Sequence, residues 1–204
     1  MKQLTPFDPS VDTQLSDTVY GMPIKGLYFI APHRSDDFRG FYAELELMPD
    51  IEATLTTQFV VKQVNHARSE KNVARGFHAE NWNKLLTVTR GSCFCVWVDL
   101  RPESDTFGHA VSMQLGDGSA DHYGSVYVSA GIGNGYVVTD GPADYLYLTD
   151  ALYRDRDQKF DRAISLFDKE LNIQWPVPRM EMVLSQRDKQ ARSLEDVRAK
   201  GFTA

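Results

Sequence analysis

Residues 84–100 read KLLTVTRGSCFCVWVDL. The two halves of this stretch, residues 84–89 and 93–100, are short, rich in Val, Leu and aromatic side chains, and typical of β-strands. Arg90-Gly91-Ser92 lies between them, and a glycine within a short polar segment is a common turn. The stretch therefore predicts a β-hairpin.

Segments of the same kind recur along the chain, separated by Gly, Asp and Pro. They span residues 59–65, 108–115, 125–129, 135–139 and 143–149. Short strands at this spacing predict an antiparallel sandwich or barrel. Short helices are expected over residues 50–57 and, after a capping box at Ser193-Leu194-Glu195-Asp196, through Lys200. We expect one all-β domain over residues 1–204, with an arm and the first strands at 1–58, a barrel core at 59–188 and a helical tail at 189–204.

The 204 residues have the composition of a folded protein and an acidic balance. Hydrophobic residues make up 42% and charged residues 25%, which excludes a disordered chain. The formal net charge of −6 disfavours general binding to nucleic acid or to anionic membranes, so neither is expected as a partner. No apolar run approaches the roughly 18 residues of a membrane span, and Met1-Lys2-Gln3-Leu4 does not begin a signal peptide. A cytoplasmic location is expected.

Two local patterns resemble binding motifs but have simpler interpretations. Cys93 and Cys95, two apart on one strand face, are badly placed for a disulfide, and no second Cys or His pair supports a metal site. We interpret them as small apolar side chains of a reduced protein. Residues 131–136, Gly-Ile-Gly-Asn-Gly-Tyr, lack the third glycine of a dinucleotide fingerprint. We interpret them as a glycine turn between two strands.

His78 lies in a short charged segment, residues 72–80. Such a histidine is more often structural than catalytic. Gln63 and Asn65 alter that balance, because polar side chains on an otherwise apolar strand face usually serve a ligand or a hydrogen-bond network. Barrel proteins of the cupin type often bind a metal through His-x-His and a carboxylate, whereas residues 78–80 read His-Ala-Glu. Metal chemistry of this type therefore lacks its ligands, and proton-transfer chemistry remains.

Six motifs occur in a specific order. They are Phe38-Arg39-Gly40-Phe41 with Glu44; Gln63-Val64-Asn65; Val73-Ala74-Arg75-Gly76-Phe77-His78; Val98-Asp99-Leu100-Arg101 with Ser104-Asp105-Thr106-Phe107-Gly108; Ile173-Gln174-Trp175-Pro176; and Leu184-Ser185-Gln186-Arg187-Asp188. Across about residues 37–188 the chain resembles the dTDP-4-dehydrorhamnose 3,5-epimerase family, the cupin-fold enzymes of deoxysugar nucleotide biosynthesis. The resemblance implies a cupin jelly-roll barrel with a few short helices. It also implies a homodimer in which the N-terminal segment of one chain completes the sheet or site of its partner.

The resemblance implies epimerisation of a dTDP-4-keto-6-deoxyhexose at C3 and C5, without a metal or an organic cofactor. The reaction removes a proton next to the ketone and returns one to the opposite face of the same carbon. It needs a base, an acid and a group that stabilises the enolate oxygen. By resemblance the base is His78, oriented by the Asp188 carboxylate, the acid is Tyr147, and the cation at the enolate oxygen is Lys84.

The same resemblance assigns the residues that bind the substrate. Arginine side chains suit phosphate oxygens, and Arg75 matches the arginine that holds the diphosphate, with Arg39 and Arg187 as further cationic contacts. The other matches are Glu44 at the nucleoside end, Gln63 and Asn65 near the sugar, Tyr153 beside it, and Asn134.

The chain departs from the family pattern at two places. Asn134 stands where most of the family has a second active-site histidine, and Ala79-Glu80 replaces an aromatic residue and glutamine, with a shortened loop to Lys84. The departures leave open an enzyme that acts at one carbon or on another nucleotide sugar. A module that binds a sugar nucleotide without turnover is a second hypothesis, and the retained His78, Lys84, Tyr147 and Asp188 argue against it. Structural alternatives also exist for single residues: Asp188 as a cap of the tail, Arg75 paired with Glu80 or Glu70, and Tyr147 as a sheet aromatic with a solvated hydroxyl.

Overall fold

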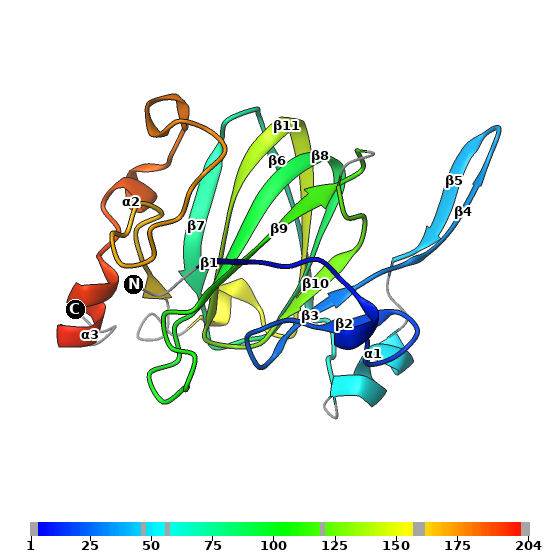
Figure 1. Cartoon of the computed structure of the whole chain (residues 1–204), viewed down its shortest axis with the longest axis horizontal. Coiled ribbons are helices and arrows are strands. Elements are labelled where there is room, and N and C mark those ends of the chain that lie inside the picture. The colour runs from blue at the N-terminus through cyan, green and yellow to red at the C-terminus, as the bar shows by residue number, and fades with distance from the viewer. Residues whose placement is uncertain (1–3, 46–47, 56–57, 119–120, 157–161, 201–204) are drawn as a thin grey trace.

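The computed structural model describes residues 4–45, 48–55, 58–118, 121–156 and 162–200. Two long antiparallel strands, β8 (Lys84–Asp99) and β11 (Ile132–Thr149), pair with each other in the centre of the molecule (Figure 1). The other strands are β1 (Leu4–Pro6), β2 (Val19–Gly21), β3 (Leu27–Ile30), β4 (His33–Asp37), β5 (Gly40–Glu44), β6 (Gln63–Ser69), β7 (Ala74–Ala79), β9 (Ala110–Gly116), β10 (Ser125–Val128) and β12 (Arg162–Ala163). The helices are η1 (Val11–Thr13), α1 (Met48–Leu55), η2 (Tyr153–Asp155), η4 (Arg179–Glu181), α2 (Gln186–Lys189) and α3 (Leu194–Lys200).

The predicted hairpin at residues 84–100 is wrong, because its two halves form one strand, β8. Gly91 has a φ of +73°, in the left-handed region, but the chain bulges there and does not reverse. Opposite this bulge, β11 has an irregularity between Asp140 and Asp144, so the two strands kink together and stay paired on both sides. The predicted strands 135–139 and 143–149 are likewise two halves of β11.

The shared kink changes which residues of each strand face the interior. Side chains of a strand alternate between its faces, so an odd number of inserted residues moves the interior positions from even to odd numbers. In β8 the interior side chains are Leu86 and Val88 before the kink and Cys93, Cys95 and Trp97 after it. In β11 they are Ile132, Tyr136 and Val138 before the kink and Ala143 and Tyr145 after it. Both strands therefore keep an apolar interior face through the bend.

The kink divides a single ten-stranded sheet into two halves that curl around this interior. On one side of the kink the strand order is β12-β7-β11-β8-β9-β1, and on the other it is β6-β11-β8-β10-β3-β2. All of these pairs are antiparallel except β1 with β9. The arrangement confirms the prediction of an all-β jelly roll with a few short helices.

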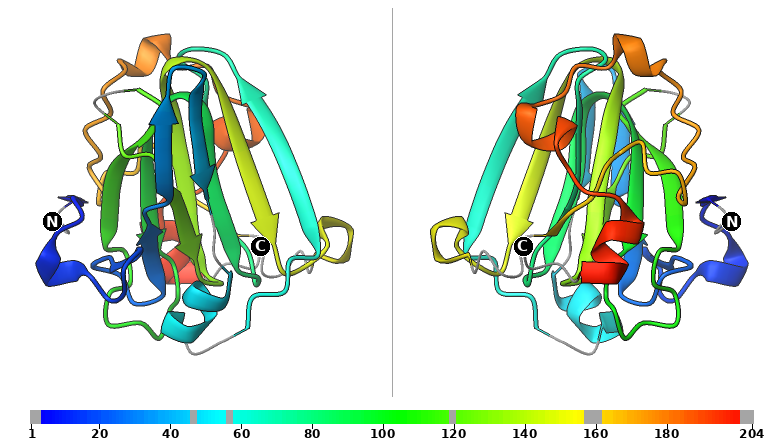
Figure 2. Two further views of the ribbon diagram at one scale, coloured as in Figure 1. Left: turned by 90° about the vertical axis from the view of Figure 1, so that its right-hand side faces the viewer. Right: turned by 90° about the vertical axis from the view of Figure 1, so that its left-hand side faces the viewer.

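Further segments cover the outer faces of the two halves, which explains why β8 is buried on both sides. The C-terminal segment supplies Leu166 and Leu194 to a cluster behind the half that contains β7 and β9. α1 contributes Ile51 to a cluster behind the other half. Figure 2 shows the C-terminal segment along one flank and α1 at the bottom of the barrel.

Several predicted boundaries need correction. The strand predicted at 59–65 begins only at Gln63, because Phe59 packs its ring edge-on against Tyr127, with 5.6 Å between centroids. The predicted glycine turn falls on Gly131, whereas residues 132–135 belong to β11. The helix predicted at 50–57 is α1, and its residues 56 and 57 lie outside the described part of the chain.

Other predictions are confirmed. The final helix is α3, and the Ser193 hydroxyl accepts a hydrogen bond from the Asp196 N–H at 3.0 Å, as an N-cap does. Cys93 and Cys95 are unpaired and buried, and burial raises the pKa of Cys93 to about 12, so this thiol stays protonated. No helix in the described residues is long and apolar enough to cross a membrane.

Gly91→Ala tests the kink. A Cβ at this position would lie 2.8 Å from the Asp140 carbonyl oxygen and 2.9 Å from that of Pro142, both in the β11 backbone. We expect the free energy of unfolding, measured with urea, to fall by about 2–4 kcal/mol, from backbone strain and overpacking together. Gly40→Ala is the matched control, because Gly40 also has a positive φ (+129°) but a Cβ there would meet nothing within 4 Å. Equal losses in both variants would contradict a role for the close approach of the strands.

Candidate active site

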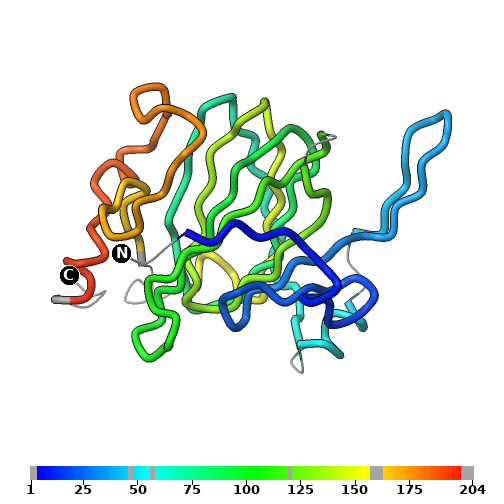
Figure 3. The backbone as a smooth tube through the Cα atoms, in the orientation of Figure 1, coloured from blue at the N-terminus to red at the C-terminus, as the bar shows by residue number. Residues whose placement is uncertain are grey.

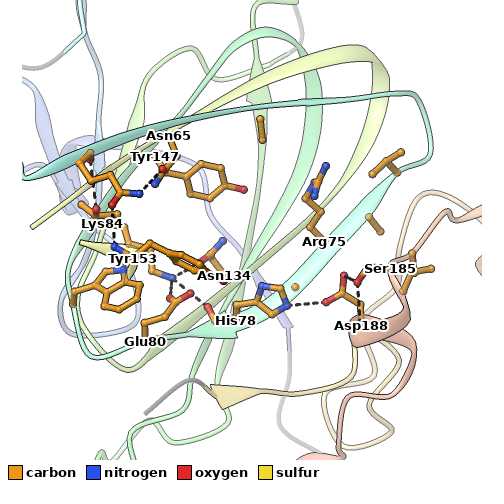
Figure 4. Close-up of a pocket in the computed structure, with 18 of the residues that line it drawn as sticks. Asn65, Arg75, His78, Glu80, Lys84, Asn134, Tyr147, Tyr153, Ser185 and Asp188 are labelled. Carbon is orange, nitrogen blue, oxygen red and sulfur yellow. Dashed lines mark hydrogen bonds and ion pairs between the residues drawn. The ribbon is translucent and has the colours of Figure 1, made fainter. Parts of the chain in front are cut away.

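A cavity of about 680 Å³ opens between β6, β7, β11 and α2, beside the first residue of β8 (Figure 4). Its volume lies within the ~300–1,000 Å³ range of small-molecule sites. Nine of the twelve predicted site residues line it: Gln63, Asn65, Arg75, His78, Lys84, Asn134, Tyr147, Tyr153 and Asp188. The fold therefore gathers residues that lie up to 125 positions apart, the separation of Gln63 and Asp188 (188 − 63).

β7 presents two of these side chains to the cavity because its pairing with β11 is irregular. Tyr136 pairs with Arg75 and Asn134 with His78, so two steps along β11 correspond to three along β7. The shift allows both Arg75 and His78 to line the cavity, although strict alternation would place them on opposite faces. Gly76 permits β7 to lie close to β11 at this shift, because its φ is +120° and a Cβ there would collide with the backbone of β11.

His78 and Asp188 form a hydrogen-bonded pair. The distance from His78 Nε2 to Asp188 Oδ1 is 2.7 Å, and the side chains are 26% and 3% exposed. The carboxylate accepts the Nε2 proton, which leaves Nδ1 of the neutral ring unprotonated on the cavity side (Figure 4). An imidazole oriented in this way can accept a proton from a bound molecule.

The Asp188 carboxylate is held in place from α2. Ser185 caps this helix by accepting a hydrogen bond from the Asp188 N–H, and its hydroxyl donates to Asp188 Oδ2 at 2.8 Å. Burial by itself would raise the pKa of Asp188, but hydrogen bonds from His78 and Ser185 and the charge of Arg187 outweigh it and lower the pKa. The group is therefore an anion at neutral pH and faces His78, so the alternative that Asp188 serves as a cap of the tail does not describe it.

Lys84 is buried, with 4% of its side chain exposed. Its ammonium pairs with the Glu80 carboxylate and donates hydrogen bonds to Asn134 Oδ1 at 2.6 Å and to the His78 carbonyl oxygen at 3.2 Å (Figure 4). The cation therefore lies beside the histidine, inside the cavity wall. An ammonium in such a water-poor site can stabilise negative charge that develops on a bound oxygen.

Tyr147 lines the cavity from the second half of β11, where it pairs with Asn65 of β6. Burial, and then the neighbouring Tyr136, raise the pKa of the Tyr147 phenol well above its ordinary value, although Arg75 opposes this. The phenol is thus a protonated donor at neutral pH, and its partly buried side chain lines the cavity together with His78. Figure 4 shows it on the other side of the cavity from His78.

Gln63, Asn65 and Tyr153 form one hydrogen-bonded group at the cavity. Gln63 Nε2 donates to Asn65 Oδ1 at 2.6 Å, and the backbone N–H of Tyr153 donates to Gln63 Oε1 at 2.9 Å. The Tyr153 side chain is half exposed. These hydrogen bonds join the Asn65 side chain, through Gln63, to the Tyr153 backbone, and all three residues line the cavity together with Tyr147.

The predicted cationic residues fall into two groups. Arg75 lines the cavity, where its Nε donates to Ser69 Oγ at 3.1 Å, and among the described residues it has no ion pair with Glu80 or Glu70. Arg187 is exposed on α2, next to Asp188 but outside the lining. Arg39 and Glu44 belong to the hairpin β4–β5, which stands clear of the barrel (Figure 3).

Two residues of the site were not among the predicted ones. Ser185 could have been found, since Ser185-Gln186-Arg187-Asp188 has the spacing of a capping box. Glu80 was considered in the comparison with a metal motif, as a departure from the family pattern and as a partner for Arg75, but no local pattern indicated its pairing with Lys84. Within the described residues no cluster of three or more His, Cys, Asp or Glu side chains could hold a metal ion.

Comparisons with known proteins agree with this geometry. The family model for dTDP-4-dehydrorhamnose 3,5-epimerase matches residues 21–196. The chain is 32% identical over 178 residues to an enzyme of that name from Pseudomonas aeruginosa, covering 86% of this chain and 94% of the relative. It is 31% identical over 183 residues to a dTDP-4-dehydrorhamnose 3-epimerase from Streptomyces niveus, covering 88% and 84%.

A solved structure gives the same result. NovW, a 4-keto-6-deoxy sugar epimerase from Streptomyces spheroides, superposes with a TM-score of 0.83 at 29% identity and covers 93% of this chain and 94% of its own. The fold expected from the sequence, a cupin jelly roll, is confirmed by this likeness and by the strand order. The chain belongs to the dTDP-4-dehydrorhamnose 3,5-epimerase family of isomerases.

Proposed function

We propose that this chain epimerises a dTDP-4-keto-6-deoxyhexose at C3 and C5, without a metal or an organic cofactor. The observation that carries the proposal is the His78–Asp188 pair, which shares one cavity with Lys84 and Tyr147. A base and an acid on different sides of one cavity suit inversion of a carbon, and a module that only binds has no need of them. The solved relatives with dTDP-4-keto-L-rhamnose and dTDP-quinovose bound support the substrate class.

In the proposed reaction His78 Nδ1 takes the proton from the carbon next to the ketone. The C–H electron pair moves into the C–C bond, and the carbonyl pair moves onto O4 to form an enolate. Lys84 stabilises the charge on O4. Asp188 stays ionised and stabilises the imidazolium, as the carboxylate of a catalytic triad does.

Tyr147 completes the inversion. Its O–H gives a proton to the opposite face of the carbon, the enolate electrons form the new C–H bond, and the ketone returns. The phenolate then regains a proton from solvent and the imidazolium releases one. Because the pKa of Tyr147 is raised, the phenolate is a strong base and this recovery is favourable.

The diphosphate requires cations, and Arg75 is the arginine that lines the cavity. Arg39 and Glu44, assigned by resemblance to the substrate, lie instead on the β4–β5 hairpin, with 76% of the Arg39 side chain exposed. The tip of this hairpin also exposes Phe38 almost completely. We propose that the chain forms a homodimer in which this hairpin completes the nucleotide site of the partner.

Solvent exchange tests the reaction and the number of carbons involved. In deuterium oxide with dTDP-4-keto-6-deoxyglucose, NMR should detect label at both C3 and C5. We expect His78→Ala to lower the exchange rate by about 10²–10⁴-fold, the usual contribution of a positioned base, while dTDP affinity measured by calorimetry stays within a few fold. Label at one carbon would indicate a single-carbon epimerase. Binding without exchange by the wild-type protein would indicate the non-catalytic module.

Tyr147→Phe separates proton removal from inversion. His78 can still remove a proton and return one to the same face, so we expect deuterium incorporation with retained configuration. Formation of the epimer should fall by about 10²-fold or more. NMR of the same sample measures both outcomes. Inversion at the wild-type rate would remove Tyr147 as the acid, and Tyr145→Phe, a change in the apolar interior, controls for loss of a hydroxyl.

Subunit mixing tests the hairpin assignment. His78→Ala and Arg39→Ala should each be weakly active alone. After the two are unfolded and refolded together, about a quarter of the sites should be intact, since half the dimers are mixed and one of their two sites has both residues. Recovery of activity supports a hairpin that serves the partner. No recovery, together with a monomeric mass by light scattering, would contradict it.

A further inference from the structure

The Lys84 ammonium is fully engaged by the protein. It forms an ion pair with the Glu80 carboxylate and donates hydrogen bonds to Asn134 Oδ1 at 2.6 Å and to the His78 carbonyl oxygen at 3.2 Å. Two of these acceptors are neutral. Only Glu80 supplies negative charge, and a buried ion that loses its partner is strongly destabilised.

Glu80 is itself held in place. Its carbonyl oxygen accepts a hydrogen bond from the Gly131 N–H at 2.8 Å, which ties the segment after β7 to the turn before β11. Its side chain is only 15% exposed, and it lines the cavity. Because the backbone of Glu80 and its carboxylate are both held, the carboxylate restricts where the Lys84 ammonium can lie.

The contacts of the Lys84 ammonium differ in length, and the difference indicates which of its protons can turn toward a ligand. The contact with the His78 carbonyl is the longest, so its proton is the one most easily turned toward a ligand oxygen. The contacts with Glu80 and Asn134 then keep the ammonium in place. Asn134 Oδ1 faces the ammonium, so its amide N–H₂ is directed away from Lys84 and is a second donor in the cavity lining.

We propose that Glu80 is a positioning residue for the epimerisation. It holds the Lys84 ammonium in place through their ion pair, so that the enolate oxygen meets a preorganised cation. The inference rests on the proposed function and adds a residue that acts only through Lys84. Two consequences distinguish it from a purely structural ion pair: the effect must fall on turnover, and it must vanish when Lys84 cannot carry charge.

Glu80→Gln tests the first consequence, because it keeps the shape of the side chain and removes the charge. Loss of a direct oxyanion donor costs about 10²–10³ in kcat, so loss of the partner that holds one should cost about 10- to 100-fold, with KM within about threefold. dTDP affinity should be unchanged. Glu181→Gln, at an exposed carboxylate of η4, is the matched control and should behave as wild type.

A double-mutant cycle tests the second consequence. In a Lys84→Met background, Glu80→Gln should change the exchange rate by no more than about twofold. If the two residues acted independently, the losses from the two substitutions would instead combine. If Glu80→Gln alone does not fold, Glu80→Asp takes its place, with a loss of about 3- to 10-fold expected from a displaced carboxylate and the same insensitivity in the Lys84→Met background.

The outcomes separate the two levels of the proposal. If the wild-type enzyme is active and the Glu80→Gln variant has the same kcat, the role of Glu80 is overturned and the proposed function is left intact. A loss that persists in the Lys84→Met background would overturn action through Lys84. A folded wild-type protein that neither exchanges nor epimerises the substrate would overturn the function and, with it, this inference.

Discussion

The kink shared by β8 and β11 is the constraint on which the rest of the structure depends. At the kink an odd number of inserted residues exchanges the interior and exterior positions of both strands. Asn134, before the kink, and Tyr147, after it, therefore line the same cavity although their numbers differ in parity. Without the exchange, Tyr147 would point to the side of its neighbours Leu146 and Leu148, away from Asn134. The geometry of the site is thus a consequence of how the sheet bends.

A second constraint is the pairing of buried charge. Asp188 and Lys84 are nearly inaccessible, and each has a partner, His78 for the first and Glu80 for the second. An unpaired charge in such a buried position is strongly destabilised, so each partner helps to retain a group that the proposed reaction requires. Arg75 has no carboxylate partner among the described residues and faces the cavity. An acidic chain can in this way present a local positive site to a diphosphate.

The sequence predicted the strand-rich class and most of the cavity lining, but not the bend. A glycine between two apolar runs has the same local pattern in a turn and in a bulge, and only pairing with β11 selects the bulge at Gly91. The wrong start of the strand at Phe59 has a similar cause, since its ring is needed in the outer layer. Glu80 was missed because its partner becomes known only when the fold buries Lys84.

The site also limits how single- and double-carbon epimerases of this kind can differ. C3 and C5 both flank the C4 ketone, so one enolate oxygen and one cation serve both carbons. The proposed base and acid can then remain the same, and the number of carbons inverted must depend on whether the sugar ring can present each C–H to His78 in turn. In this chain the ring would lie against Gln63, Asn65 and Tyr153, which hydrogen bonds join into one group. If Lys84 holds O4 as proposed, a rigid contact here would fix a single presentation, whereas the half-exposed Tyr153 ring leaves room for a second. The number of carbons inverted would therefore depend on the residues that hold the sugar ring, and not on the catalytic groups.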